Sequence, residues 1–254
     1  MGLRTLGAAF AKAGDPSRNN FLLIRIVAAL LVLIGHSYVL ASGNNLPNGD
    51  PLRAVTHYVS SHILGVQIFF LISGFLVTAS FERRREIISF LISRGLRLWP
   101  GLLVCVLLTT FFLGPLISEW SLKSYLLEEE TRRYILLNGS LLGFSDALPG
   151  VRFSSGPHGT QINGSLWTIG LEARLYLGVA ILGVIGVLQK PILAALFFVA
   201  AIFFLAISGL NEISQARDGS GLLLSAFFVM GALLYIVRAW VPLSSGWGLV
   251  LLIS

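Results

Sequence analysis

Long apolar blocks alternate with short polar connections along the chain. A helix needs about 17 to 25 mostly apolar residues to cross a bilayer, and the blocks that reach this length are residues 21–41, 62–81, 98–117, 166–188, 191–210 and 221–240. Another apolar block begins at Gly246 and reaches Ser254, where the sequence ends. The pattern predicts an all-α fold, a polytopic transmembrane helical bundle with about six full spans and a truncated seventh.

The longest polar connection covers residues 118–165 and carries three consecutive acidic residues, Glu128, Glu129 and Glu130. Within it, residues 134–144 are apolar but too few to cross a bilayer, which predicts an interfacial or re-entrant helix. A turn region rich in Gly, Pro and Ser follows this helix. We expect the whole connection to face outward, together with residues 42–61 and 211–220.

The composition supports a membrane protein, because 55% of the residues are hydrophobic and only 12% are charged, against about 25% charged in a soluble domain. We expect a single membrane domain over residues 1–254. The one cysteine, Cys105, excludes an intramolecular disulfide and a cysteine-based metal site. His57, His62 and His158 lack metal-ligand spacing and are interpreted as surface histidines, so neither a metal nor a bound cofactor is expected.

The basic residues lie in short runs between the apolar blocks, and the formal net charge is +6. If the spans alternate in direction, one side of the membrane receives Arg4, Lys12, Arg18, Arg83, Arg84, Arg85, Lys190 and Arg238. Short cytoplasmic connections are enriched in Lys and Arg. This distribution predicts a multi-pass protein of the cell's inner (cytoplasmic) membrane with a cytoplasmic N-terminus, and it argues against a nucleic-acid partner.

Arg25 and His36 are ionisable residues inside the first predicted span, where charge is costly and commonly functional. They are eleven residues apart, about three helical turns, so both face one side of the helix. Counted from Phe21 at ~1.5 Å per residue, Arg25 lies ~6 Å and His36 ~22 Å from the cytoplasmic boundary. The alternatives are a neutral core histidine for His36 and an arginine whose side chain reaches the interface for Arg25.

The fourth predicted span has a polar stripe at helical spacing, formed by Ser165, Thr168, Glu172 and Tyr176, with Trp167 beside it at the outer boundary. Counted from the outer ends of their spans, Glu172 lies ~10 Å deep and His36 ~7 Å deep, so the two side chains could meet. A general base with an orienting carboxylate can activate a hydroxyl for attack on an acyl group. The alternative for Glu172 is a structural ion pair, for example with Arg174.

Two further segments combine apolar residues with distinctive side chains. Arg94 and Arg97 are one turn apart just before Pro100, near the cytoplasmic start of the third predicted span. Their guanidinium groups could converge on a phosphate, although anchoring of the topology explains them as well. The segment GVQIFFLISGF in the second predicted span contains Ser73 and Gly74, which favour close packing against another helix.

Four ordered segments of this chain resemble the bacterial acyltransferase family 3, whose members are integral membrane O-acyltransferases. LLIRIVAALLVLIGH places Arg25 and His36 like the basic residue and histidine of the family's opening helix, and GVQIFFLISGFL is similar to its second helix. FLISRGLRLWP resembles its paired-arginine segment through Arg94, Arg97 and Pro100. NGSLWTIGLEARLYL is similar to its Ser-Leu-Trp segment through four residues, namely Ser165, Trp167, Glu172 and Tyr176.

The resemblance implies an acyl-CoA donor on the cytoplasmic side and a hydroxyl acceptor on a cell-surface or exported saccharide, or on a lipid-linked glycan. Such proteins usually have about ten spans, so this sequence is expected to lack the family's C-terminal helices. His36 is expected to act as the base and Glu172 to orient His36 or the acceptor. The other expected substrate-binding residues are Arg25, Arg94, Arg97, Ser165, Trp167 and Tyr176. The alternatives are a transporter or flippase for a glycan or lipid-linked precursor and a structural membrane subunit.

Overall fold

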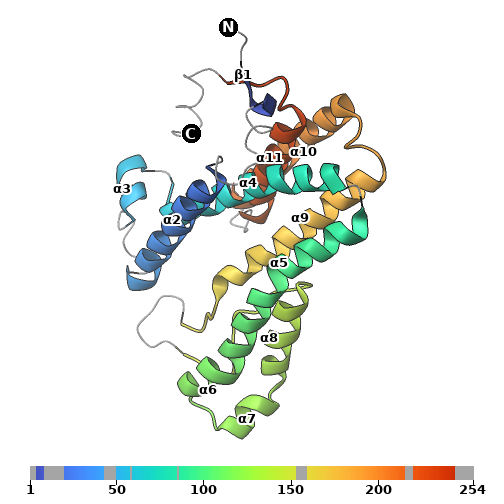
Figure 1. Cartoon of the computed structure of the whole chain (residues 1–254). Helices are drawn as coiled ribbons and strands as arrows, with labels where there is room; N and C mark the ends of the chain where they lie inside the picture. Colours follow the sequence, from blue (N-terminus) through green and yellow to red (C-terminus); the bar gives the residue numbers. More distant parts are fainter. Residues whose placement is uncertain are drawn as a thin grey trace. The chain divides into compact units, whose positions relative to one another are not determined.

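The computed structural model describes residues 4–8, 20–42, 50–57, 59–84, 86–152, 159–214 and 220–243. Most of the described part is helical, which confirms the predicted all-α fold (Figure 1). Its long helices are α2 (Phe21–Ser42), α4 (Ser61–Arg84), α5 (Ile87–Leu108), α9 (Trp167–Val184), α10 (Pro191–Ser214) and α11 (Ser220–Ile236). The two short strands β1 (Arg4–Thr5) and β2 (Pro242–Leu243) form an antiparallel pair.

Short helical segments connect the long helices. They are α3 (Pro51–Thr56), the π-helical turn η3 (Thr109–Leu113), α6 (Gly114–Ile117), α7 (Leu122–Leu127), α8 (Glu129–Ser140) and the 3-10 turn η4 (Gly164–Leu166). Helix α8 is the one expected at residues 134–144, but it begins earlier and ends at Ser140. It ends there because Leu141 adopts a left-handed conformation, with φ of 63°, which cannot continue a helix.

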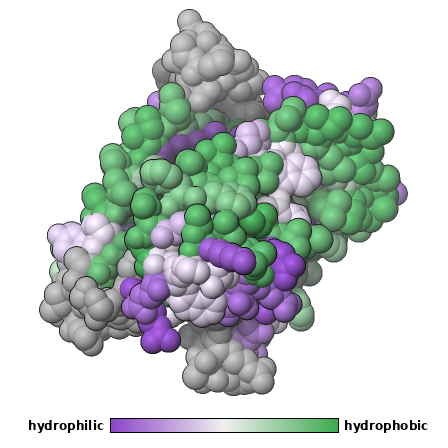
Figure 2. All heavy atoms as spheres, turned by 90° about the horizontal axis from the view of Figure 1, so that it is seen from below, coloured by the Kyte–Doolittle hydropathy of each residue, from purple (hydrophilic) through white to green (hydrophobic). Residues whose placement is uncertain are grey.

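Five helical stretches are long and apolar enough to cross a membrane, namely Phe21–Leu40, Ser61–Arg84, Ile87–Ile117, Gly164–Val184 and Pro191–Glu212. Large apolar side chains are exposed along these helices, and in Figure 2 apolar residues cover much of the face shown. This surface makes the chain a multi-pass membrane protein. Helix α11 is apolar but only 17 residues long, the lower end of a spanning length. The predicted count of six full spans therefore stays a prediction, and the predicted seventh lies outside the described residues.

The third span differs from its predicted bounds. Its helix begins at Ile87 rather than residue 98 and continues through the π-helical turn to Ile117, which gives 31 residues and a length of ~47 Å. Arg94 and Arg97 therefore lie well inside the helix instead of at its start. The helix continues through the two arginines although they interrupt the apolar pattern. Their long side chains can carry the charge toward an interface.

The fourth span ends earlier than predicted. Helix α9 stops at Val184 because Gly186, with φ of 82°, takes the left-handed conformation of a helix terminus. The Gly186 N–H then donates to the Gly183 carbonyl oxygen at 3.2 Å, and the Val187 N–H donates to the Leu182 carbonyl oxygen at 3.0 Å. These bonds satisfy carbonyl groups that the helix itself leaves unpaired.

The chain folds into two compact units. Unit 1 comprises Met1–Val32, Ile63–Arg85 and Ile181–Ser254, and unit 2 comprises Leu33–His62 and Glu86–Ala180. In unit 1, α4 and α11 approach closely: a Cβ at Gly74 would lie 1.9 Å from the Phe228 carbonyl oxygen. This close approach confirms the packing expected at Gly74.

Unit 2 has an apolar core between α5, α7, α8 and the segment before α9, formed by Leu102, Val106, Tyr125, Tyr134, Leu148, Val151 and Ile162. The π-helical turn exposes polar groups to this core, and the Tyr125 hydroxyl donates to the Thr110 carbonyl oxygen at 2.9 Å. Burial raises the pKa of Tyr125 to about 12, since the apolar surroundings disfavour the phenolate. Asn163, just before α9, donates to Thr109 Oγ1 at 2.7 Å and to the Tyr134 hydroxyl at 3.1 Å. The core thus fixes the start of the helix that carries Glu172.

Candidate active site

His36 lies on α2 in contact with a second histidine, His62, in the first turn of α4. The ring centroids are 5.0 Å apart and the rings are tilted by 34°. Gly35 makes this approach possible, because a Cβ there would lie only 2.3 Å from the His62 backbone nitrogen. Both histidines are half-buried, and His62 Nδ1 is buried without a hydrogen-bond partner in the described part of the chain.

The interpretation of His62 as a surface histidine was therefore wrong. Residue 62 is next to the connection in sequence, but the packing of α2 against α4 covers part of its ring. His57 is exposed, as expected, at the end of α3. His158 lies outside the described residues. A histidine at the first turn of a helix can face either solvent or a neighbouring helix, and only the tertiary packing decides which.

Asp50 holds the start of α4 in place. Its Oδ1 accepts hydrogen bonds from the backbone N–H groups of Leu52 and Arg53 at 2.9 and 3.1 Å, which caps α3. The same carboxylate accepts from the Ser61 N–H at 3.0 Å and from the Ser61 hydroxyl at 2.9 Å, at the beginning of α4. The residue is buried. A single carboxylate therefore joins two helix N-termini and fixes the residue next to His62.

The four hydrogen bonds make Asp50 a source of pH-dependent stability. Burial by itself raises the pKa of Asp50, but the bonds from Arg53, Ser61 and Leu52 outweigh it and leave the pKa below its usual value. A carboxyl group whose pKa is lowered by folding stabilises the folded state at pH values above its pKa in the unfolded chain. That contribution is lost as the pH falls through the pKa of the group in the folded protein. We expect Asp50→Asn to lower the unfolding free energy at pH 7 by about 1–2 kcal/mol, because the Asn side chain carries no charge and its amide nitrogen cannot accept the hydrogen bond from the Ser61 N–H.

The measurement is thermal unfolding in detergent at pH 7 and at successively lower pH, with Glu130→Gln as the control because Glu130 is an exposed carboxylate. The difference between wild type and Asp50→Asn should shrink as Asp50 becomes protonated, while the control should show little difference throughout. A gap that stays constant into the acid range would show that the ionised carboxylate does not supply this stability.

Glu172, Tyr176 and Arg94 come together on α9 and α5. The Tyr176 hydroxyl donates a hydrogen bond to Glu172 Oε1, and the Tyr176 side chain is buried. The guanidinium carbon of Arg94 lies 5.9 Å from the Tyr176 ring centroid and 5.8 Å from that of Phe90, within the range of cation–π attraction. The structure thus adds Arg94, from another helix, to two residues that the sequence already placed on one polar stripe. Arg174 donates from Nε to the Gly170 carbonyl oxygen of its own helix at 3.2 Å.

The remaining candidate residues are less enclosed. Ser165 is exposed in the η4 turn, where its carbonyl oxygen accepts from the Thr168 hydroxyl at 2.9 Å. Trp167 begins α9 and is half-buried, and Arg97 is exposed on α5. Arg25 is half-buried on the part of α2 that belongs to unit 1. The pairing of His36 with Glu172 stays a prediction, because the contacts that the structure shows join each of them to a different partner.

The sequence reasoning missed Asp50 and the part that His62 plays. An acidic residue directly before a proline is a signal for a helix start, and Asp50-Pro51 carries it. That signal predicts the cap of α3. It contains no information on Ser61, which lies eleven residues later and is reached only because the chain folds back.

No solved structure matches this chain. It is 32% identical over 200 residues to an O-acetyl transferase of Shigella phage Sf6. The aligned region covers 79% of this chain and 55% of the phage protein. It is 44% identical over 88 residues to nodulation protein 10 of Rhizobium leguminosarum bv. viciae, covering 34% of this chain and 23% of that protein. A regulator of hypoxia-inducible factor 1 from Caenorhabditis elegans is 29% identical over 174 residues, covering 61% of this chain and 32% of the nematode protein.

The chain thus spans about half the length of the phage relative and less of the other two. The model of the acyltransferase domain family matches residues 19–254. That range contains His36, His62, Arg94 and the whole of α9. Because the match covers almost the entire sequence, the chain belongs to acyltransferase family 3.

Proposed function

We propose that this chain provides the membrane acyltransferase site of an O-acyltransferase, which moves an acetyl group from acyl-CoA to a hydroxyl of a cell-surface or exported saccharide. The observation that carries the proposal is the half-buried His36, held against His62 near one end of a spanning helix. An imidazole so placed suits general-base chemistry on a hydroxyl. Membership of the family and the name of the phage relative support acetyl transfer to oxygen.

The proposed reaction needs one base and no bound cofactor, with acyl-CoA as co-substrate. His36 takes the proton of the acceptor hydroxyl while that oxygen forms a bond to the thioester carbonyl carbon. The carbon–sulfur bond then breaks, and the departing thiolate takes the proton back from His36. His62 limits the movement of the His36 ring, and Asp50 holds the turn that carries His62. Glu172 orients His36 or the acceptor in this proposal.

The other candidate residues are assigned to the two substrates. Arg94 and Arg97 bind donor phosphates from the cytoplasmic side, and Arg25 lines the donor's route toward His36. Cation–π contacts hold the Arg94 guanidinium in place before a ligand arrives, which lowers the entropy cost of binding. Ser165 and Trp167 contact the acceptor at the outer end of α9, and Tyr176 positions Glu172. This arrangement assumes an inner membrane and a cytoplasmic N-terminus.

Proteoliposomes test the proposal against the transport alternative. Acetyl-CoA labelled in the acetyl group is supplied on one side and a candidate saccharide, or a lipid-linked glycan, on the other. An acyltransferase produces labelled ester on the saccharide, with free CoA released in equal amount. A transporter or flippase moves label or glycan across the bilayer without forming an ester, and that result would replace the proposed function. Empty vesicles give the background of both signals.

A further inference from the structure

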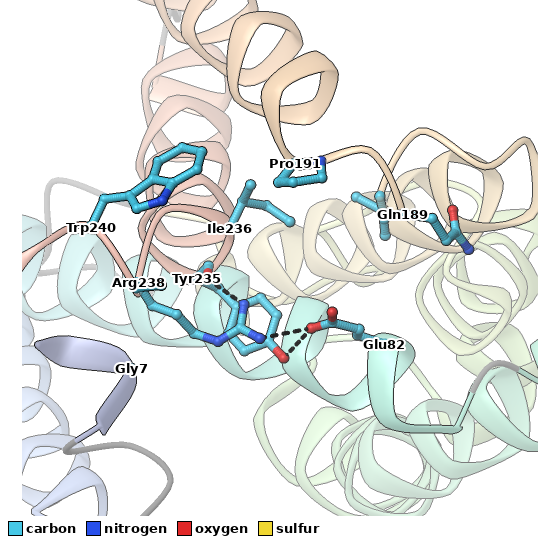
Figure 3. A pocket seen from close by; sticks show the side chains of 10 residues that line it. Gly7, Glu82, Gln189, Pro191, Tyr235, Ile236, Arg238 and Trp240 are labelled. Atoms are coloured by element: carbon cyan, nitrogen blue, oxygen red, sulfur yellow. Dashed lines mark hydrogen bonds and ion pairs between the residues drawn. The ribbon is translucent and has the colours of Figure 1, made fainter.

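Unit 1 contains a cavity of about 690 Å³ that none of the residues assigned above lines. It lies where α4 and α11 end and where the chain turns into α10 (Figure 3). Its polar lining is formed by Glu82, Gln189, Tyr235 and Arg238, and Trp240 contributes a large apolar surface. Cavities of about 300–1,000 Å³ that combine apolar walls with a few polar groups at defined positions are typical of small-molecule sites.

Arg238 is held in position at this cavity by three contacts. Its Nη2 lies 3.2 Å from Glu82 Oε2, and its Nη1 donates to the Tyr235 carbonyl oxygen at 2.7 Å. The guanidinium carbon also lies 3.8 Å from the Tyr235 ring centroid. The Tyr235 hydroxyl donates to the same carboxylate of Glu82, so the three side chains brace one another (Figure 3).

The contacts with Glu82 and Tyr235 leave N–H donors of Arg238 for a ligand. A guanidinium has five N–H donors, and the two hydrogen bonds of Arg238 within the described residues use two of them. The side chain is 28% exposed and lines the cavity. An arginine already fixed in its orientation loses little conformational freedom when it binds an oxyanion, and its planar fork matches phosphate.

The local charge favours an anion. Arg83 and Arg84 follow Glu82 at the end of α4, and Lys190 lies directly before Pro191, which lines the cavity. Arg238 lines the cavity and the other three basic residues adjoin lining residues in sequence, whereas Glu82 is the one carboxylate among the lining residues. The apolar surface of Trp240 would contact an organic group attached to the anion. A simple inorganic ion would leave most of a 690 Å³ cavity unfilled.

We propose that this cavity binds an organic phosphate, with the phosphate oxygens on Arg238 and the organic portion against Trp240. The phosphate ester could be carried by a soluble nucleotide such as CoA or by an anionic phospholipid headgroup. Binding does not depend on acyl transfer, so the test measures it without turnover.

The test compares wild type with Arg238→Gln in discs of phosphatidylcholine, with CoA as the soluble probe and calorimetric titration as the measurement. A second arm uses discs made from equal parts of phosphatidylcholine and phosphatidylglycerol, and measures phospholipid retained by the purified protein. We expect Arg238→Gln to weaken one of the two probes about tenfold, the loss typical of a charged hydrogen-bonding partner. Weaker CoA binding identifies a nucleotide site, and weaker retention of phosphatidylglycerol identifies a lipid site.

Two further variants keep the result decisive if Arg238→Gln folds poorly. Glu82→Gln removes the negative charge beside Arg238 but keeps an oxygen that can accept its hydrogen bond, so it should tighten the same probe that Arg238→Gln weakens. Arg53→Gln removes an exposed arginine on α3 and serves as the matched control, with no expected change. The proposal is overturned if wild type binds neither probe, if a well-folded Arg238→Gln binds both probes as tightly as wild type does, or if Glu82→Gln changes binding no more than the Arg53→Gln control.

Discussion

Replacing His36 by Ala is expected to lower acyl transfer by at least about 10²-fold, and up to about 10⁴-fold, because the variant has no group to take the proton from the acceptor hydroxyl. Membrane insertion should be unaffected, since Ala is a good helix former and His36 is only half-buried. The measurement is the rate of ester formation in proteoliposomes that contain equal amounts of inserted protein.

His57→Asn is the matched control for this variant. His57 is exposed and has a left-handed backbone with φ of 63°, which Asn tolerates. It should therefore keep normal insertion and normal ester formation. Near-normal turnover of His36→Ala would remove His36 as the base. If both variants lost activity equally, the loss would reflect a general disturbance around the connection between α2 and α4 and not the missing imidazole.

Replacing Gly231 by Ala is expected to be among the most destabilising single substitutions in unit 1. A Cβ at this position would lie 1.9 Å from the Leu71 carbonyl oxygen, which is backbone and cannot rotate away. Helices α4 and α11 would have to separate, and the close approach of Gly74 to Phe228 on the same interface would open as well. Overpacking of this kind costs about 1–3 kcal/mol or more.

Gly101→Ala is the control, because a Cβ there meets nothing within 4 Å. In a helix interior the change from Gly to Ala favours folding by up to about 1 kcal/mol. The measurement is the thermal midpoint and the fraction of monodisperse protein in detergent. Equal midpoints for the two variants would mean that α4 and α11 can move apart without loss, which contradicts the close packing at this interface.

The membrane class and the positions of most long helices could be predicted from the sequence. Helices α2 and α10 begin at the expected residues, Phe21 and Pro191. The start of α5 could not be located, because Arg94 and Arg97 interrupt the apolar pattern although the helix continues through them. Hydropathy records the preference of each side chain for lipid, whereas a helix boundary depends on backbone hydrogen bonding, and the two need not coincide.

Part of the candidate site also follows from spacing along one helix. Glu172 and Tyr176 are four residues apart, which brings them to one face of α9, and the structure joins them by a hydrogen bond. Arg94 lies on a different helix, and its position over the Tyr176 ring could not be predicted from spacing. Contacts between helices depend on how far each helix is rotated and shifted against its neighbour. No regular spacing of residues along the sequence reveals this rotation or shift.

By itself the sequence determined that this is a helical membrane protein, and its motifs pointed to the acyltransferase family that the comparison then showed. Lipid leaves no alternative to helices for long apolar blocks, because every backbone group must be satisfied within its own segment. Only the tertiary structure decided that His62 lies against His36 and that Asp50 holds Ser61. These contacts join residues from separate elements, so they arise only when those elements have packed.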